Sequence, residues 1–231
     1  MAGAISARLF SAAELVRQGA VLADIGTDHA YLPLFLLSEG RIRRAVCSDI
    51  NEGPLDSARK HARELGFDGD IDFVLCDGAA ALAGRGITDY TVCGMGGELI
   101  AAIIDRAPSF KDTDINLILQ PMSRQGVLRK YLASHGFEIK CESYSSDSGK
   151  YYVTFLVNYT GRFTEIDDVE AELGVKSAQY VNKDAQICYL KAKLAAFTKQ
   201  RDGKIRGGDN AEKEALLAEK AEELIAALTN E

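Results

Sequence analysis

An acidic segment with a single glycine is the part of the sequence best suited to chemistry. Residues 24–31 read Asp-Ile-Gly-Thr-Asp-His-Ala-Tyr and lie between an apolar run and a helix-like run, which is the context in which a glycine turn binds a ligand. A dinucleotide-binding loop has glycines where Asp28 and Tyr31 stand, because a pyrophosphate must approach the backbone closely. The carboxylates of Asp24 and Asp28 would repel a pyrophosphate but attract a cation. The segment therefore favours a cationic ligand, unless it is only a tight turn.

S-adenosylmethionine is such a ligand, since it carries a sulfonium and an ammonium and no phosphate. The residues after the next strands suit its other parts. Asp49 follows Gly26 by 23 residues and can accept hydrogen bonds from ribose hydroxyls, although a helix N-cap needs the same residue type. Asp77-Gly78 can accept from an adenine amino group or form an ordinary turn. We predict cofactor contacts from Asp24, Gly26, Asp49, Ile50, Asp77, Gly78, Gly94 and Met95, the last two in a glycine-rich turn that otherwise serves only packing.

The elements that must position these residues alternate along the chain. Short apolar runs end in Gly or Asp and are followed by helix-like stretches, which is typical of a parallel sheet covered on both faces. We expect strands at Ala20–Ile25, Ala45–Asp49, Ile71–Cys76, Tyr90–Cys93 and Ile115–Gln120. We expect helices at Ala30–Ser38, Pro54–Leu65, Gly97–Arg106 and Ser123–His135. The acidic residues would then lie at the carboxyl edge of the sheet, where ligands bind.

The alternation changes after the fifth strand. Phe137–Cys141 and Tyr151–Tyr159 both look like strands, and Glu142–Lys150 between them is too short for a parallel crossover. We therefore expect an antiparallel hairpin, which is typical of the seven-stranded class I methyltransferase (Rossmann-like) sheet with its antiparallel last strand. A nicotinamide dehydrogenase would continue with a helix here.

The sequence after Tyr159 has the pattern of two packed helices. Apolar residues recur at helical spacing from Ile187 to Phe197 and from Leu217 to Leu228, and Asp202–Asn210 is a glycine-containing linker. We predict a helical hairpin, as an antiparallel coiled coil. The chain would then have a cofactor-binding methyltransferase domain at residues 1–160 and a helical domain at residues 161–231.

Composition narrows the class of protein. The 231 residues carry 27 Lys and Arg against 34 Asp and Glu, and the net charge of −7 excludes a strongly basic domain that coats nucleic acid, but not local basic patches. The 5 cysteines contain no CxxC pair, so we expect buried thiols in a reducing cytosol and no metal site. Because neither a signal peptide nor a membrane-spanning apolar run is visible, we expect a cytoplasmic protein without a membrane partner.

Several motifs together resemble a known family. Residues 19–33, GAVLADIGTDHAYLP, are similar to the signature of bacterial tRNA (adenine-22-N1)-methyltransferases, as are Gly94-Met95-Gly96-Gly97 and Leu119-Gln120-Pro121. An N-terminal Ser-Ala-Arg-Leu at residues 6–9 is similar too, and the resemblance covers nearly the whole chain. Met122 stands where the family usually has Asn, so no role is carried over to that side chain. The resemblance implies a seven-stranded fold, S-adenosylmethionine as methyl donor, and N1 of adenine 22 in the D-arm of tRNA as acceptor.

The implied reaction needs positioning rather than activation of the acceptor. Adenine N1 has a free lone pair, so neither a nucleophilic triad nor a metal is expected. Methylation leaves positive charge on the base, and Asp28 is our candidate to stabilise it, with contact to the cofactor ammonium as the alternative. The base must leave its pairing and stack, for which Tyr31 is the nearest aromatic residue unless it faces the core. His29 either orients Asp28, touches the base, or only caps or packs; Asp28, His29 and Tyr31 are the predicted catalytic residues.

Binding of tRNA requires cations. Residues 185–208 hold six bases and one acid, whereas residues 209–231 hold seven acids and two lysines. Either the two helices pair by charge, or the basic helix and its linker follow tRNA phosphates. We predict tRNA contacts from Lys199, Arg201, Lys204 and Arg206, and from a second group at the rim of the cleft, Arg8, Arg41, Arg43 and Arg44. Arg8 can instead neutralise the cofactor carboxylate.

The sequence therefore predicts an enzyme that methylates N1 of adenine 22 in tRNA with S-adenosylmethionine, with tRNA as its partner and no protein partner. Two alternatives stay open. The same fold can methylate another RNA, a protein or a small molecule, because a fold does not define a substrate. A non-catalytic RNA-binding protein could also retain the sheet.

Overall fold

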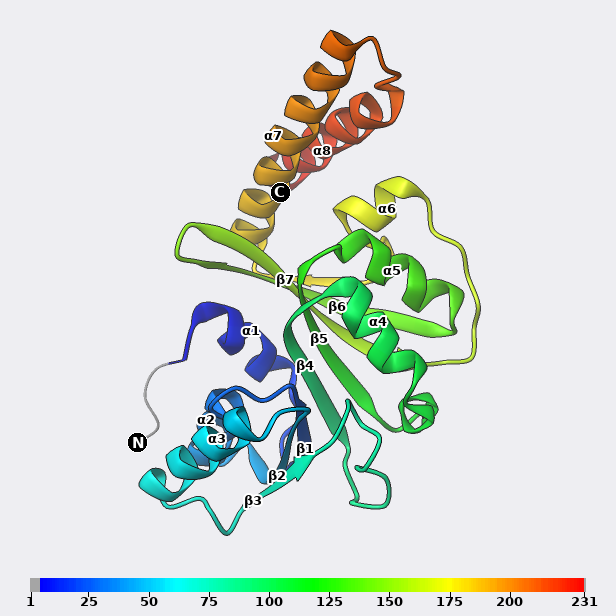
Figure 1. The fold of residues 1–231 in the computed structure, drawn as a ribbon. Helices are drawn as coiled ribbons and strands as arrows, with labels where there is room; N and C mark the ends of the chain where they lie inside the picture. Colours follow the sequence, from blue (N-terminus) through cyan, green and yellow to red (C-terminus); the bar gives the residue numbers. More distant parts are fainter. Residues whose placement is uncertain (1–4, 231) are drawn as a thin grey trace.

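The computed structural model describes residues 5–230, and a single eight-stranded sheet forms its centre (Figure 1). The strands lie in the order β3-β2-β1-β4-β5-β7-β6-β8, and β1 to β5 run parallel. Their bounds are β1 Ala20–Ile25, β2 Ile42–Asp49, β3 Ile71–Leu75, β4 Asp89–Gly96, β5 Asn116–Ser123, β6 Phe137–Asp147, β7 Lys150–Tyr159 and β8 Gln179–Val181. The order changes direction between β1 and β4, and open parallel sheets bind their ligands at such a point, beyond the carboxyl ends of the strands.

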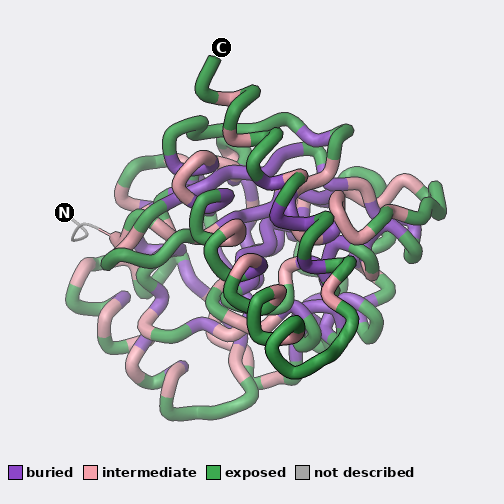
Figure 2. The backbone as a smooth tube through the Cα atoms, turned by 90° about the horizontal axis from the view of Figure 1, so that it is seen from above, coloured by how far each residue is buried: buried purple, intermediate pink, exposed green. Residues whose placement is uncertain are grey.

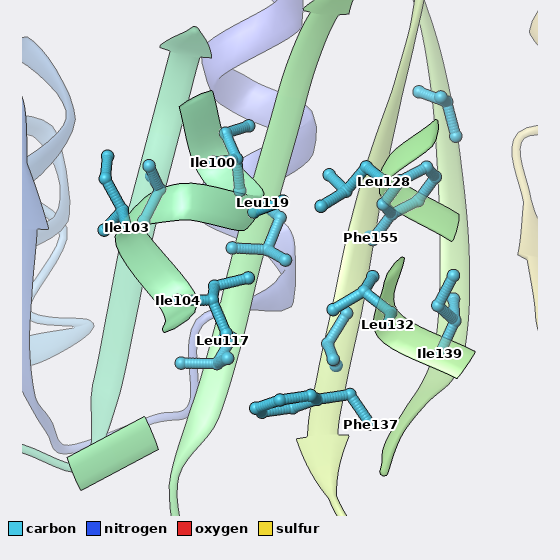
Figure 3. Packing of buried hydrophobic residues seen from close by; sticks show 14 of the residues in the cluster. Ile100, Ile103, Ile104, Leu117, Leu119, Leu128, Leu132, Phe137, Ile139 and Phe155 are labelled. Atoms are coloured by element: carbon cyan, nitrogen blue, oxygen red, sulfur yellow. The ribbon is translucent and has the colours of Figure 1, made fainter. Parts of the chain in front are cut away.

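Helices cover both faces of the sheet, as predicted. They are α1 Ala7–Leu15, α2 Tyr31–Ser38 and α3 Glu52–Leu65 on one face, and α4 Gly97–Asp105 and α5 Gln125–Ser134 on the other, with a short 3-10 helix, η1 Pro108–Lys111. Side chains of β5 alternate between the two cores: Leu117 and Leu119 pack under α4 and α5 (Figure 3), and Ile118 packs under the first three helices. Seen from above, buried segments fill the middle and exposed turns surround them (Figure 2).

The antiparallel hairpin is confirmed, but the segment predicted between its strands is wrong. β6 and β7 pair antiparallel from Phe137 with Tyr159 to Asp147 with Lys150, so the connection consists of two residues only. Both of them, Ser148 (φ 51°) and Gly149 (φ 75°), adopt the left-handed backbone that a tight hairpin turn requires. The Ser-rich composition of residues 142–150 suggested a loop. In the structure, β6 and β7 instead remain paired up to the two-residue turn at the end of the hairpin.

The sheet contains one strand more than the seven predicted. β8 pairs parallel with β6, with Gln179 opposite Cys141, and it comes from the C-terminal part of the chain. Leu190 and Tyr189 of the following helix are buried in the same cluster as β6 and β7 side chains. The division at residue 160 stays a prediction, and residues on both sides of it share one core.

The C-terminal helices form the predicted hairpin (Figure 1). A short helix, α6 Asp168–Leu173, precedes α7 Lys183–Gly207 and α8 Glu212–Asn230. The predicted linker Asp202–Asn210 is wrong, because α7 continues through Gly203 to Gly207 and ends with Gly208 in the left-handed conformation (φ 78°). Glycine lowers helix propensity by only about 1 kcal/mol, which packing against α8 can offset. Among residues 5–230, no helix is long and apolar enough to cross a membrane.

A buried ion pair joins α5, β6 and α6. Arg129 donates from Nε and Nη2 to the two carboxylate oxygens of Glu142, each at 2.8 Å, and both side chains are fully buried. Arg129 Nη1 also donates to the carbonyl of Ala171 at 2.8 Å, and the Tyr144 hydroxyl donates to Glu142 at 2.6 Å. Burial, and then the charge of Glu142, raises the pKa of Tyr144, so its hydroxyl remains a donor. These bonds satisfy the buried charges, as a buried pair requires.

Candidate active site

The turn after β1 is fixed by backbone bonds to β2. The amides of Gly26 and Thr27 donate to the carbonyl of Ser48 at 2.8 and 3.0 Å. Gly26 has φ 73°, a left-handed conformation that glycine adopts without strain. A Cβ atom at this position would lie 2.0 Å from Cε of Met95, so the absence of a side chain also makes room for Met95.

The carboxylate of Asp24 is buried and held on both oxygens. Thr27 Oγ1 donates to Oδ2 at 2.6 Å, and Thr91 Oγ1 of β4 donates to Oδ1 at 2.7 Å. Burial raises the pKa of Asp24, while the two hydroxyl hydrogen bonds lower it. Asp24 lines a cavity, so its carboxylate lies at the wall of a possible ligand site and not deep in the core.

Two cavities meet at the carboxyl ends of the strands. The larger, about 550 Å³, is lined by the N-terminal part of α1, the turn after β1 and the end of β4; the smaller, about 210 Å³, lies over the ends of β1, β2 and β3. Gly26 and Met95 line both cavities, so these two residues lie between them. The larger one also contains Asp24, Asp28 and Tyr31. A long ligand with one end in each cavity fits this shape, and volumes of this size are usual for small-molecule sites.

The smaller cavity brings together four of the predicted cofactor residues, Asp49, Ile50, Asp77 and Gly78. Asp49 Oδ1 accepts a hydrogen bond from the amide of Asn51 at 2.8 Å. The N-cap residue of α3 is Asn51, without a side-chain cap bond, so Asp49 is not the helix N-cap that the alternative proposed. Asp77 Oδ2 pairs with Arg106 at 2.8 Å. The predicted contacts of these side chains with a cofactor remain predictions.

Of the three predicted catalytic residues, Asp28 and Tyr31 line the larger cavity, and His29 lies between them in the chain. Tyr31 is 48% exposed, so it does not face the core. Asp28 is exposed and pairs with Nε2 of His29 at 3.2 Å, and the rings of His29 and Tyr31 lie 5.4 Å apart. His29 (φ 62°) and Ala30 (φ 54°) both adopt the left-handed backbone, which costs each non-glycine residue about 1–3 kcal/mol. Surrounding contacts must therefore stabilise this turn.

Gln120 organises the cavity in a way that the sequence did not reveal. Its side chain is fully buried, and its Oε1 accepts from Arg8 Nη1 at 2.6 Å and from the amide of Gly94 at 3.1 Å. One carboxamide therefore bonds both α1 and the C-terminal part of β4. The sequence placed Gln120 at the ligand-binding edge, but no spacing pattern connects residue 120 with residue 8. Arg8 lines the larger cavity, as expected if it binds a cofactor carboxylate.

The only cysteine that lines the larger cavity within the described residues is Cys93. Burial, and then the charge of Asp24, raises the pKa of the Cys93 thiol. A protonated thiol is a poor nucleophile. The cavity thus offers positioned carboxylates and a guanidinium rather than a covalent nucleophile.

The arginines of β2 do not lie at the rim of the cleft, and this prediction is wrong. Arg41, Arg43 and Arg44 stand at the amino end of β2, whereas the cavities lie beyond the opposite, carboxyl ends of the strands. Arg41 donates to the carbonyls of Val16 and Glu14, and Arg44 pairs with Asp72. Proximity in sequence to Asp49 does not bring these residues to the site, because an extended strand separates the two edges.

The basic residues of α7 include some that form ion pairs and others that line a groove. Lys204 donates to both carboxylate oxygens of Glu214 in α8, at 2.8 and 2.9 Å, and Arg201 pairs with the neighbouring Asp202 at 2.9 Å. Charge pairing between the helices therefore accounts for Lys204. Lys199 and Arg206 line a shallow groove on another face of α7, together with Lys191.

Comparisons with known proteins agree with this geometry. The model of the methyltransferase-domain family matches residues 5–155. The tRNA (adenine(22)-N(1))-methyltransferase of Bacillus subtilis is 29% identical over 187 residues, which cover 81% of this chain and 79% of that protein. The structure of Streptococcus pneumoniae Sp1610 in complex with S-adenosyl-L-methionine is 30% identical, with a TM-score of 0.82, and covers 96% of this chain and 100% of that chain. M. capricolum TrmK in complex with S-adenosyl-homocysteine is 28% identical, with a TM-score of 0.76, and covers 97% and 99%.

The match to the family model extends from α1 to β7 and so includes both cavities. The similarity to the solved structures continues through the C-terminal helices. The chain therefore belongs to the methyltransferase-domain family and, within it, to the tRNA (adenine(22)-N1)-methyltransferases.

Proposed function

We propose that this protein methylates N1 of adenine 22 in the D-arm of tRNA, with S-adenosylmethionine as methyl donor. The protein is an enzyme, and tRNA is its substrate. The observation that carries the proposal is the pair of adjacent cavities, with carboxylates in both and Arg8 in the larger, in a chain of this family. The reaction belongs in the cytoplasm and needs no protein partner.

The lining residues match the parts of S-adenosylmethionine. Arg8 can bind its carboxylate, and Asp24 can attract its ammonium from the larger cavity. Asp49 retains a carboxylate oxygen for ribose hydroxyls, and Asp77 with Gly78 can bind the adenine. When bound, S-adenosylmethionine supplies an electrophilic methyl group on a sulfonium. Gly26 and Met95, which lie between the two cavities, would then be close to that methyl group.

Tyr31, Asp28 and His29 serve the acceptor base. The exposed ring of Tyr31 offers a stacking surface to an adenine that has left its base pair. The carboxylate of Asp28 stabilises positive charge on that base, and the 3.2 Å contact with His29 Nε2 restricts its orientation. No side chain needs to remove a proton from N1, because its lone pair is free to attack the methyl group.

A test of the function uses unmodified tRNA transcripts and methyl-labelled S-adenosylmethionine. We expect the label in 1-methyladenosine at position 22 and none in a transcript with guanosine at that position. Nucleoside mapping by mass spectrometry measures both. Label at another position or in another class of substrate would contradict the proposal, and no cofactor binding in calorimetry would favour a non-catalytic RNA-binding protein.

Replacement of Asp49 tests the cofactor site. We expect Asp49→Ala to weaken S-adenosylmethionine binding by about 1.5–3 kcal/mol, the range for hydrogen bonds to charged groups. Isothermal calorimetry on the folded variant measures the change. Asp56→Ala removes an exposed carboxylate from the same helix region, where it pairs only with Arg59, and should bind as the wild type does. Equal affinity of Asp49→Ala and wild type would contradict the assignment.

Replacement of Asp28 separates its two possible partners. Asp28→Asn keeps the shape but removes the charge, so the single-turnover rate should fall roughly tenfold to a hundredfold if the carboxylate stabilises the methylated base. The two dissociation constants should change little. Asp68→Asn, an exposed acid in the turn after α3, is the control. A loss confined to S-adenosylmethionine affinity would show that Asp28 binds the ammonium instead.

We propose that the cations that line the groove on α7 bind tRNA phosphates. Replacing Lys191, Lys199 and Arg206 with Ala should weaken tRNA binding. It should also make the negative slope of log affinity against log salt shallower, by roughly 0.7–0.9 for each phosphate that the variant no longer neutralises. Fluorescence anisotropy across a salt series measures both. Lys204→Ala removes one charge that already pairs with Glu214, so the slope should not change. Wild-type affinity and slope in the triple variant would mean that tRNA is bound elsewhere.

A further inference from the structure

One histidine outside the two cavities contacts the predicted catalytic turn. His61 lies in the third turn of α3, and its Nδ1 is 2.9 Å from the backbone carbonyl of His29. A carbonyl only accepts hydrogen bonds, so Nδ1 must carry the hydrogen. His61 is half-buried and lines neither cavity. Its bond therefore reaches the site through the backbone of the turn and not through a ligand.

The position of this bond gives it a specific consequence. His29 and Ala30 are the two consecutive left-handed residues that turn the chain from β1 into α2. The carbonyl of Ala30 accepts from Leu34 in the first turn of α2, at 3.0 Å, but the carbonyl of His29 precedes the helix and has no such partner. Among the described residues, the carbonyl of His29 accepts its hydrogen bond from His61. The hydrogen bond thus spans from α3 to the strained part of the turn.

The imidazole of His61 also contacts the exposed aromatic ring of the site. Its ring lies 5.2 Å from that of Tyr31 at an angle of 77°, an edge-to-face arrangement. Tyr31 in turn lies 5.4 Å from His29. Tyr31 is nevertheless 48% exposed, so part of this residue remains accessible to solvent or a base. The backbone bond and the ring contact restrain the same short segment from the side of α3.

We infer that His61 is a positioning residue for the acceptor base: it orients the His29–Ala30 turn and the Tyr31 ring without touching the substrate. The inference rests on the proposed function, because it assigns Tyr31 to the base. It separates the roles of two neighbouring segments. Residues 49–51, at and just after the end of β2, line the smaller cavity, which we assign to the cofactor, whereas the third turn of α3 acts on the acceptor side. His61 should accordingly affect the rate with tRNA but not the binding of S-adenosylmethionine.

Two substitutions distinguish the hydrogen bond from the bulk of the ring. His61→Leu fills the space without a donor, whereas His61→Asn keeps an amide nitrogen near the position of Nδ1. We expect the single-turnover rate of His61→Leu, at saturating tRNA and cofactor, to fall about fivefold to tenfold, as for the loss of one hydrogen bond in the reacting geometry. His61→Asn should retain a rate near that of wild type. Calorimetric affinity for S-adenosylmethionine should be unchanged in both.

His135 provides a matched control. It lies at the C-terminal end of α5, its Nδ1 is 2.8 Å from the carbonyl of Tyr131, and its ring stacks on Tyr131 at 4.0 Å. The contacts resemble those of His61, but they connect His135 to Tyr131 of α5 and not to the turn after β1. His135→Leu should therefore leave the rate unchanged. If His61→Leu does not fold, His61→Gln gives the same comparison, because its longer side chain places the amide beyond the position of Nδ1.

Three results would overturn the inference: a wild-type rate in His61→Leu, an equal loss in His61→Leu and His61→Asn, or a parallel loss of S-adenosylmethionine affinity. The wild-type protein separates this inference from the proposed function. A wild type that does not methylate adenine 22 contradicts the proposed function. An active wild type with an equally active His61→Leu variant contradicts only the role of His61.

Discussion

The buried carboxylate of Asp24 is the constraint on which the rest of the site depends. A carboxylate in a protein interior is stable only when hydrogen bonds replace its lost water, and here Thr27 and Thr91 provide them. Thr27 belongs to the turn after β1, and Thr91 belongs to β4. The same two bonds that stabilise the charge therefore attach the turn to the neighbouring strand. The carboxylate, the glycine turn and the end of β4 are fixed together beside the larger cavity.

Other parts of the site are attached to this centre by single polar side chains that link distant segments. Gln120 joins α1 to the C-terminal part of β4, and His61 joins α3 to the turn after β1. Each of these side chains hydrogen-bonds a backbone group of a distant segment. Gln120 accepts from the amide of Gly94, and His61 donates to the carbonyl of His29. Such bonds restrain loops at a sheet edge, where the regular ladder ends and few other contacts hold the chain. The proposed catalysis depends on positioning the acceptor base and the methyl donor. The hydrogen bonds of Gln120 and His61 contribute by restraining the segments that line the site.

The C-terminal helices combine two uses of charge. Lys204 with Glu214, and Lys193 with Glu172, join elements within this region, whereas Lys191, Lys199 and Arg206 remain on a separate face of α7. Arg129, which forms a fully buried pair with Glu142 of β6, also donates to the carbonyl of Ala171 in α6 and so attaches this region to the sheet. An acidic protein can thus present a local basic face, because net charge does not describe where charges lie.

The sequence by itself determined the parallel strands, the terminal hairpin, the helices on both faces and the acidic turn after β1, because these follow from local periodicity and from which residues follow each strand. It did not predict β8 or the continuation of α7 through Gly203 and Gly207, since packing against β6 and α8 decided both. Arg41, Arg43 and Arg44 were misplaced because sequence distance does not show which edge of a sheet a residue occupies. Gln120 and His61 acquire their partners only when residues 112 and 32 positions apart are brought together. Only the tertiary structure decided these contacts, because side-chain hydrogen bonds between distant segments have no periodic signature.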